Sequence, residues 1–514
     1  LPPAPRKRTK KELLALVDPY DHPYDEEEAT STVDEHLRSV QDPYMRSYAP
    51  ADGPNLTITR NEEDLEYPTF EQVSSNHGPE GDIIAALRHA CLTYVNNPER
   101  WADLDHIWDL YQRLPEPRIT YMDGRMRGLL FWALGQPKKK DTKSMLRYFA
   151  VVADTKNSGF PLTLVQWNGA IAFAGRYLRH ATEADTESAL KLWRDMEYEA
   201  GIRANDVTFN ILFDVATNAG NFALAEMIYA EMEARGLRFD RYSYVSLMHF
   251  FGLRLDTSGV RATYREMVSA GEMIDTVALN AVLKALLLAR EEDAADRLYE
   301  RMKASVDCRS AETQYGTKTN SAQRSRRVTK ALMRMAELGR ARPEMQPTLQ
   351  ADTPIHPDLL TFRLLLKHYC VEVGDLGRVA GYIDDMRALQ IPLHGAIFVA
   401  LFRGFAIYGG IPFSPWSEAR LESIFAALIS ALDDKESEIG GGGGGGGGGS
   451  DVEIQRWMVV HALKAFARCS TRAKVLDVYE ALKERWRLSF AEEQFMKEVL
   501  SSVFRELGVG GRGR

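Results

Sequence analysis

Residues 206–240 read DVTFNILFDVATNAGNFALAEMIYAEMEARGLRFD, a pattern that recurs along the chain. In the first part of this stretch the apolar side chains are spaced as on one face of an α-helix, and the same spacing returns after Ala219-Gly220-Asn221. Gly236 follows the second segment, where glycine commonly ends a helix because it adopts left-handed backbone angles at little steric cost. The stretch therefore predicts two amphipathic helices, helix A and helix B, joined by a tight turn.

This pattern repeats at a fixed interval. Met232, Met267 and Met302, near the ends of three successive B helices, are spaced by 35 residues. Three copies follow one another without a gap at 206–240, 241–275 and 276–310, and looser copies flank them at 81–117, 118–163, 164–205, 359–394, 395–439 and 456–490. A hairpin of this size cannot bury its apolar face alone, so neighbouring copies have to stack into one continuous core. We expect an all-α α-solenoid superhelix of helix–turn–helix repeats; an irregular helical bundle, the alternative, would not keep equal spacings.

The composition is that of a folded protein. Of the 514 residues, 45% are hydrophobic and 26% are charged, which excludes wholesale disorder. No apolar run approaches the ~18 residues that a membrane-spanning helix needs, so we expect no membrane span. The four cysteines lie far apart without a C-x-x-C pair, which excludes a disulfide scaffold and the common zinc modules. The net charge of −8 argues against a protein that coats nucleic acid indiscriminately.

Several segments do not follow the repeat. Residues 1–80 read as an extended arm, with a basic cluster, an acidic run and Pro-Tyr pairs but no helical or strand periodicity. Since the chain begins at Leu1, we expect that a preceding piece, including any targeting presequence, has been removed. Ten consecutive glycines read as a flexible linker or a placeholder. The expected order is the arm at 1–80, repeats at 81–310, a basic insertion at 311–358, repeats at 359–439, the glycine segment at 440–450, and a degenerate repeat with a C-terminal helix at 451–514.

The insertion is basic in an otherwise acidic chain. Its lysines and arginines are Lys318, Arg324, Arg326, Arg327, Lys330, Arg334, Arg340 and Arg342. Such an excess predicts a segment that contacts phosphates, because each contact releases counterions from nucleic acid. Arg324, Arg326 and Arg327 are the candidate contacts, and a solvated loop is the alternative. A helix is expected over residues 328–338.

The repeats resemble the pentatricopeptide repeat family. Val207-Thr208-Phe209-Asn210 is similar to the V-T-Y-N-like run that opens helix A in that family. The segment from Glu231-Met232 to Gly236 is similar to the E-M-x-x-x-G-like run that closes its helix B. The tetratricopeptide repeat, the nearest alternative, has a period of 34 residues and a W-x-x-L-G-x-x-Y pattern, and the chain shows neither. The resemblance implies a right-handed α-solenoid superhelix with a period of 35.

The resemblance also implies RNA binding, with one base read by each repeat. In the family, the residue after the helix A aromatic hydrogen-bonds the base edge, a role that falls here on Asn168, Asn210, Val245, Asn280 and Arg363. The last residue of the repeat assists it, a role that falls on Asn205, Asp240, Asp275, Ser310 and His394. An apolar residue near the start of helix A packs on the base face, a role that falls on Val165, Val207, Tyr242, Val277 and Leu360.

These roles agree with the chemistry of the side chains. An asparagine amide offers a donor and an acceptor to a base edge, and a carboxylate can fix its orientation. Asn210 with Asp240 resembles the family's uracil-type pair, and Asn168 with Asn205 resembles a pyrimidine-type pair. Three residues depart from the pattern and leave open whether their repeats bind a base or only support the superhelix: Val245, Arg363 and Val399. Asparagine is also common as a helix N-cap, which is the structural alternative to a base contact.

The sequence contains no catalytic signature. It has no G-x-S-x-G, H-E-x-x-H or G-x-x-x-x-G-K-[ST] motif, so we expect no enzymatic activity, no cofactor and no metal. The resemblance implies an organellar RNA-binding protein of the mitochondrial matrix, whose partner is mitochondrial mRNA or rRNA in processing, stability or translation. Two alternatives remain: a structural subunit or assembly factor of the mitochondrial ribosome, in contact with its proteins, and a protein-binding scaffold without RNA contact.

Overall fold

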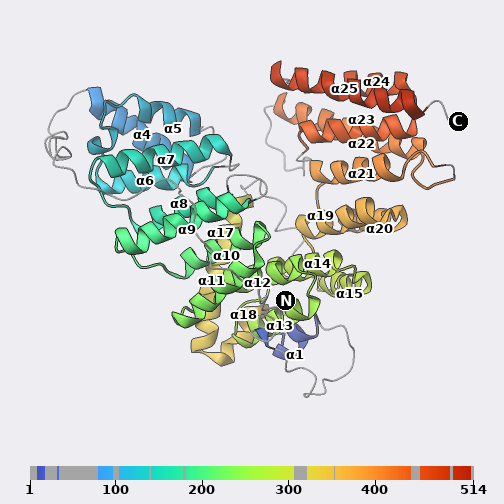
Figure 1. Cartoon of the computed structure of the whole chain (residues 1–514). Helices are drawn as coiled ribbons and strands as arrows, with labels where there is room; N and C mark the ends of the chain where they lie inside the picture. Colours follow the sequence, from blue (N-terminus) through green and yellow to red (C-terminus); the bar gives the residue numbers. More distant parts are fainter. Residues whose placement is uncertain are drawn as a thin grey trace. The chain divides into compact units, whose positions relative to one another are not determined.

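The computed structural model describes residues 8–17, 32–33, 79–96, 104–137, 141–176, 181–305, 321–351, 353–411, 413–440, 452–486 and 490–510. Within these ranges every regular element is a helix (Figure 1), as the sequence predicts. None of the described helices is long and apolar enough to cross a membrane. Most of the expected arm at 1–80, Ser310 and the glycines at 441–449 lie outside the described residues.

The chain divides into two compact bodies. The first body comprises residues 1–273 and 319–350, and the second body comprises residues 274–318 and 351–514. The first body contains α1 (Lys10–Leu14), α4 (Pro79–Asn96), α5 (Leu104–Gln112), η2 (Arg118–Tyr121), α6 (Gly124–Leu134), α7 (Thr142–Asn157), α8 (Leu164–Arg176), α9 (Glu183–Arg194), η3 (Asp195–Glu199), α10 (Asp206–Asn218), α11 (Phe222–Ala234), α12 (Arg241–Leu253), α13 (Thr257–Ser269), α17 (Ser321–Ala341), η4 (Pro343–Met345) and α18 (Gln346–Ala351), which ends at the boundary. The second body contains α14 (Thr276–Leu288), α15 (Glu292–Lys303), α19 (Leu359–Lys367), η5 (His368–Val373), α20 (Leu376–Ala388), α21 (Gly395–Tyr408), α22 (Glu418–Gly440), α23 (Arg456–Cys469), α24 (Arg472–Lys483) and α25 (Phe490–Gly510).

The hairpin predicted for residues 206–240 is confirmed as α10 and α11. Asn205 caps α10, and its side chain and that of Thr208 exchange hydrogen bonds with each other's backbone N–H. Gly220 turns the chain with a φ of +75°, a left-handed angle that favours glycine, and Asn221 then caps α11. Gly236 ends the hairpin with a φ of +64°. Local capping and two glycines thus set the boundaries of this repeat.

Hairpins stack through their A helices in each body. We use the name A helices for α8, α10, α12, α14, α19, α21 and α23, and B helices for their partners α9, α11, α13, α15, α20, α22 and α24. In the first body α10 contacts both α8 and α12, and in the second body α19 contacts α14 and α21, which in turn contacts α23. The core between them is apolar and aromatic at the fourth residue of each of six A helices, which is Trp167, Phe209, Tyr244, Leu279, Phe362 or Phe398. This is the packing of an α-solenoid.

The insertion forms part of the first body. The helix expected over 328–338 is confirmed and extends further, as α17. Leu332 and Ala336 of α17 pack against Met273, which follows α13, and all three side chains are buried. Arg340 forms an ion pair with Glu272 at 2.7 Å. A solvated loop therefore does not describe this segment.

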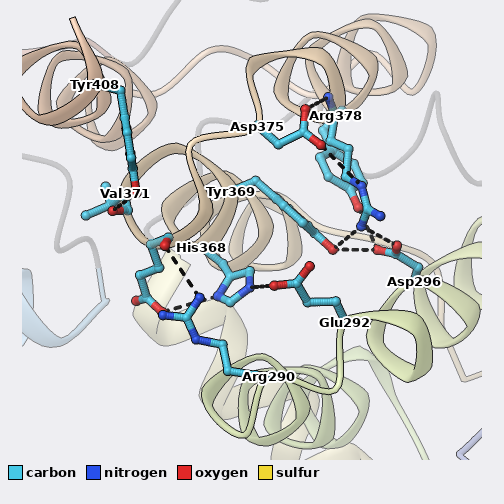
Figure 2. A network of polar contacts seen from close by, with 11 residues as sticks. Arg290, Glu292, Asp296, His368, Tyr369, Val371, Asp375, Arg378 and Tyr408 are labelled. Carbon is cyan, nitrogen blue, oxygen red and sulfur yellow. Dashed lines mark hydrogen bonds and ion pairs between the residues drawn. The ribbon is translucent and has the colours of Figure 1, made fainter.

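The hairpin α19–α20 stacks on α14–α15 although the insertion separates them in sequence. Asp296 of α15 accepts hydrogen bonds from the hydroxyls of Tyr369 and Tyr382, at 2.9 and 3.0 Å. Arg378 donates to the other carboxylate oxygen of Asp296 at 2.7 Å (Figure 2). The pKa of Tyr369 is raised to about 12 by burial and by this carboxylate, so its hydroxyl stays a donor at neutral pH. One carboxylate thus holds three groups of the next hairpin.

A buried histidine adds a second contact between these hairpins. His368, the first residue of η5, has one ring nitrogen 3.1 Å from Glu292 of α15 and the other 3.2 Å from Glu372 (Figure 2). Glu372 also accepts a bond on its backbone oxygen from Arg290, at 3.4 Å. In the second body the array therefore resumes after the insertion through a polar joint that covers the apolar core.

Candidate nucleic-acid interface

The second residue of the A helices, counted after the N-cap, is an exposed apolar side chain. Val207, Tyr242 and Val277 are 47%, 49% and 42% exposed. The same holds for Val165, Leu360 and Trp457. An apolar residue exposed at one helical position in repeat after repeat is not explained by packing, because the core lies on another face. The apolar candidates from the sequence therefore lie where a base could reach them, and Trp457, which sequence reasoning missed, shares their position at the start of α23.

The fifth residue of three A helices is an asparagine inside the helix. Asn168, Asn210 and Asn280 all follow the first turn of α8, α10 and α14, so the N-cap alternative is wrong for these three. Asn168 donates from Nδ2 to Asn205 Oδ1 at 3.4 Å and accepts at Oδ1 from the Thr208 hydroxyl at 2.7 Å. Both bonds run from one hairpin to the next, and they fix which way the amide faces.

Asn280 repeats this geometry with a partner that the sequence analysis did not assign. Its Nδ2 donates to Asp358 Oδ1 at 3.0 Å, and its Oδ1 accepts from the Thr361 hydroxyl at 2.8 Å. Asp358 thus lies where the sequence analysis expected Ser310, which is outside the described residues. The insertion delays the next A helix, so the residue that precedes α19 is not the one found by counting 35 residues. The signal was present, since Asp358-x-x-Thr361 matches Asn205-x-x-Thr208.

The residues expected to end the repeats are N-caps of the following A helix. Asn205, Asp240, Asp275 and Asp358 cap α10, α12, α14 and α19 through backbone N–H groups. His394 caps α21 in the same way through Nδ1, at 3.1 Å from the Ala396 nitrogen. Such a cap contributes about 1 kcal/mol to stability. These side chains thus stabilise the helix that they cap. The cap also fixes their orientation, next to the fifth residue of the preceding repeat.

Asn210 differs from the other two asparagines in having its amide available. In the described part of the chain its side chain makes no hydrogen bond and is half-buried, whereas Asn280 is only 2% exposed. Asp240, on the next hairpin, uses Oδ1 to accept from the Ser243 backbone at 3.0 Å. The Asn210 amide can therefore donate and accept toward a base edge without breaking a bond within the protein.

The structure describes the basic candidates only in part. Arg363 is the fifth residue of α19 and is exposed. Arg324, Arg326 and Arg327 lie near the start of α17, where only the course of the helix backbone is described. Their expected phosphate contacts stay predictions.

Two pKa shifts report positive charge along the A helices of the second body. The pKa of Lys284 is lowered, first by burial and then by the charge of Lys367. The pKa of His461 is lowered to about 4 by burial and by the neighbouring charges of Arg403 and Lys464. His461 is therefore neutral at pH 7, and an anion bound nearby would be attracted by the cations around it.

A metal-binding arrangement is not found among the residues that the structure describes. No three or more His, Cys, Asp or Glu side chains there form a group that could hold a metal ion. Cys91 and Cys370 are buried, which raises the pKa of each thiol to about 12 and leaves it protonated.

Comparison with known proteins gives one consistent result. The pentatricopeptide repeat domain model matches residues 191–254, which run from the end of α9 through α12. A chloroplastic pentatricopeptide repeat-containing protein of Arabidopsis thaliana is 24% identical over 189 residues, which are 37% of this chain and 23% of that protein. The chain thus spans less than a quarter of that relative's length.

Solved structures give similar matches. The pentatricopeptide repeat protein PPR10 from maize aligns over 96% of this chain and 60% of its own, with 15% identity and a TM-score of 0.36. The same protein in complex with an 18-nt psaJ RNA element aligns over 88% of this chain and 62% of its own, with 14% identity and a TM-score of 0.36.

Proposed function

We propose that this chain, which is a pentatricopeptide repeat protein, binds single-stranded RNA along its A helices. The observation that carries the proposal is the shared register of three side chains on successive hairpins: an exposed apolar second residue, an asparagine fifth residue, and an oxygen-bearing N-cap on the next hairpin. Bases offer flat faces that stack on apolar side chains and edges that hydrogen-bond to amides. The register supplies both at each such repeat.

The repeat formed by α10 and α11 is the best candidate for reading a base. Val207 and Tyr242 are the exposed second residues of α10 and α12, on the two neighbouring hairpins. Asn210 has its amide available, and Asp240 is oriented by its cap. The family resemblance implies that this pair accepts uracil. The repeat of α14 has the same residue types, since Asn280 meets Asp358.

The proposed cellular role rests on the family resemblance more than on the geometry of the site. We propose an organellar protein acting in the processing, stability or translation of mRNA or rRNA, in the mitochondrial matrix. The Arabidopsis relative is named chloroplastic, which supports an organelle of one kind or the other. Fractionation of organelles, with detection of the protein in mitochondria or in plastids, tests this assignment.

A second role is favoured by one observation. The fifth residue is Val245 on α12, Val399 on α21 and Val460 on α23, and a valine cannot hydrogen-bond a base edge. A chain in which few repeats read a base fits a subunit or assembly factor of the mitochondrial ribosome, held by structured RNA and by ribosomal proteins. Sedimentation with ribosomal particles at moderate salt distinguishes this role from that of a factor bound to free mRNA.

RNA binding itself is tested with labelled oligo(U), oligo(C) and oligo(A) by fluorescence anisotropy. Asn210→Ala is expected to weaken oligo(U) binding about tenfold and to reduce the preference among the three, because about 1.4 kcal/mol of edge contact is lost. The matched control is Asn157→Ala, an exposed asparagine at the end of α7, which should change nothing. Absence of any RNA affinity at low salt, with affinity for a protein complex, would identify a scaffold instead.

A further inference from the structure

The ninth residue of every A helix in the second body is a cation. Counted after the N-caps Asp275, Asp358, His394 and Gln455, this residue is Lys284, Lys367, Arg403 and Lys464 on α14, α19, α21 and α23. Because these four helices contact one another in that order, the cations share one face of a continuous layer. We call these four residues the cation row.

No acidic side chain interrupts the cation row on its own helices. The sequences of α14, α19, α21 and α23 contain seven lysines and arginines and no aspartate or glutamate. Acids of this body lie on the B helices, such as Asp385 of α20 and Asp433 of α22, at the N-caps Asp275 and Asp358, and at Glu372 of η5, which continues α19. Between their caps, the four A helices therefore carry positive charge alone.

The cation row is accessible to a ligand. Lys367 and Lys464 are exposed and Arg403 is half-buried, and in the described ranges these three side chains form no ion pair with a carboxylate. Burial lowers the pKa values of Lys284 and His461, and the charges of the neighbouring Lys367, Arg403 and Lys464 lower them further, which agrees with the close spacing of these cations. Such unneutralised positive charge costs stability in the folded state, and a bound anion would relieve it.

The first body lacks this row. The ninth residue is Asp214 on α10 and His249 on α12, and Ala172 on α8. Apolar side chains flank the cation row, with Leu360, Ile407 and Trp457 each at least 42% exposed. Cations interleaved with exposed apolar and aromatic side chains are typical of surfaces that bind single-stranded nucleic acid without reading its sequence.

We propose that the cation row binds the phosphates of an RNA backbone and makes the second body a sequence-independent RNA site. This inference rests on the proposed RNA binding and deepens it. The fifth residue in three of the four repeats is Arg363, Val399 or Val460, none of which pairs with a base edge as asparagine does. The second body therefore contributes affinity, and the repeat of Asn210 contributes base preference.

The test is the salt dependence of RNA affinity for the full chain. A triple variant, Lys367→Gln with Arg403→Gln and Lys464→Gln, removes three charges from the A layer. Its matched control, Arg387→Gln with Lys474→Gln and Lys483→Gln, removes three charges from B helices. Each phosphate contact contributes roughly 0.7 to the slope of log K against log salt concentration for single strands, so the triple variant should lose about 2 from that slope. Oligo(U) and oligo(C) should weaken alike, and the control should keep the wild-type slope.

Each result decides the proposal. The proposal for the cation row is overturned if the triple variant keeps the wild-type slope. It is also overturned if the variant loses base preference and not slope. In both cases RNA binding by the wild type still stands. A wild type that binds no single strand at low salt overturns the proposed function and the row together. Thermal melting by circular dichroism controls for folding, and the variant Lys367→Arg with Lys464→Arg, which retains the charge, should retain the slope.

Discussion

The two bodies use the same hairpin for different surface chemistry. In the first body the A helices carry the half-buried Asn210 and Asp214, with Asp240 as the next cap, whereas in the second body the equivalent helices carry the exposed Lys367 and Lys464. The buried fourth residue and the N-cap are of the same kinds in both. The hairpin backbone therefore constrains only some helical positions, and the fifth and ninth positions can differ in charge and polarity between repeats that stack in the same way.

The largest expected difference in stability between the two bodies comes from Asp296→Ala. This variant removes the acceptor of Tyr369, Tyr382 and Arg378. The two tyrosine hydroxyls lose their acceptor, while Arg378 keeps Tyr369 and Asp375, so the second body should be destabilised by about 2–4 kcal/mol. Hydrogen exchange of peptides from the two bodies should show faster opening in the second body alone. Asp384→Ala, which removes an exposed ion pair with Arg387, should cost less than about 0.5 kcal/mol. Equal loosening of both bodies would contradict the division.

The next largest effect is a pH dependence of the stability of the second body, where His461 lies. His461 has a pKa of about 4 in the folded chain against 6.5 when unperturbed, so between these values the unfolded chain binds more protons. The stability that this ring contributes is therefore complete above pH 6.5 and is lost as the pH drops toward 4. At 1.36 kcal/mol per pKa unit the shift corresponds to about 3.4 kcal/mol, which solvent screening reduces to about 2–3 kcal/mol because the ring is only partly buried. His461→Gln should remove this part of the acid sensitivity in urea titrations at several pH values. An unchanged profile would show that burial and the neighbouring cations do not lower the pKa of this ring.

A smaller effect tests whether the threonine–asparagine hydrogen bond between neighbouring hairpins has the same strength in each body. Thr208→Val and Thr361→Val each remove a hydroxyl that donates to a buried asparagine, Asn168 or Asn280. Each variant should lose about 1–2 kcal/mol because one amide oxygen is left without its donor. Urea denaturation should give similar losses for both. A loss in only one variant would mean that the joints are not equivalent.

The smallest effect on stability, and the sharpest on base choice, is expected from Asp240→Asn. Asparagine caps a helix as well as aspartate does, so unfolding should change by less than about 0.5 kcal/mol. The resemblance implies that the pair with Asn210 would then accept pyrimidines in general and no longer favour uracil. Competition between oligo(U) and oligo(C) measures this change. A variant that keeps its uracil preference would remove Asp240 from base reading.

The sequence predicts what is local and periodic. Helix pairs, their glycine ends and the exposed apolar side chains such as Val207 follow from spacing that short-range physics imposes. The Asn280–Asp358 pairing was missed because a count of 35 residues loses its register when a segment is inserted. Counting residues from each predicted N-cap would have kept the register and found this pairing.

The rest depends on contacts between distant segments. The Asp296 joint and the packing of Leu332 on Met273 join residues that are far apart in sequence, and no periodic pattern encodes them. Lys367, Arg403 and Lys464 could each be recognised as helix A cations from the sequence. Their common ninth position emerged only when the structure fixed the N-caps.

The placement of α17 has a consequence for synthesis of the chain. Met273 is covered by Leu332 and Ala336, and between them in sequence lie α14 and α15, which belong to the second body. A ribosome releases the chain from its N-terminus, so the first body cannot complete its core until part of the second has already emerged. Truncation at residue 273 would leave Met273 uncovered. Synthesis of the first body's core therefore spans the synthesis of α14 and α15, although each body is compact.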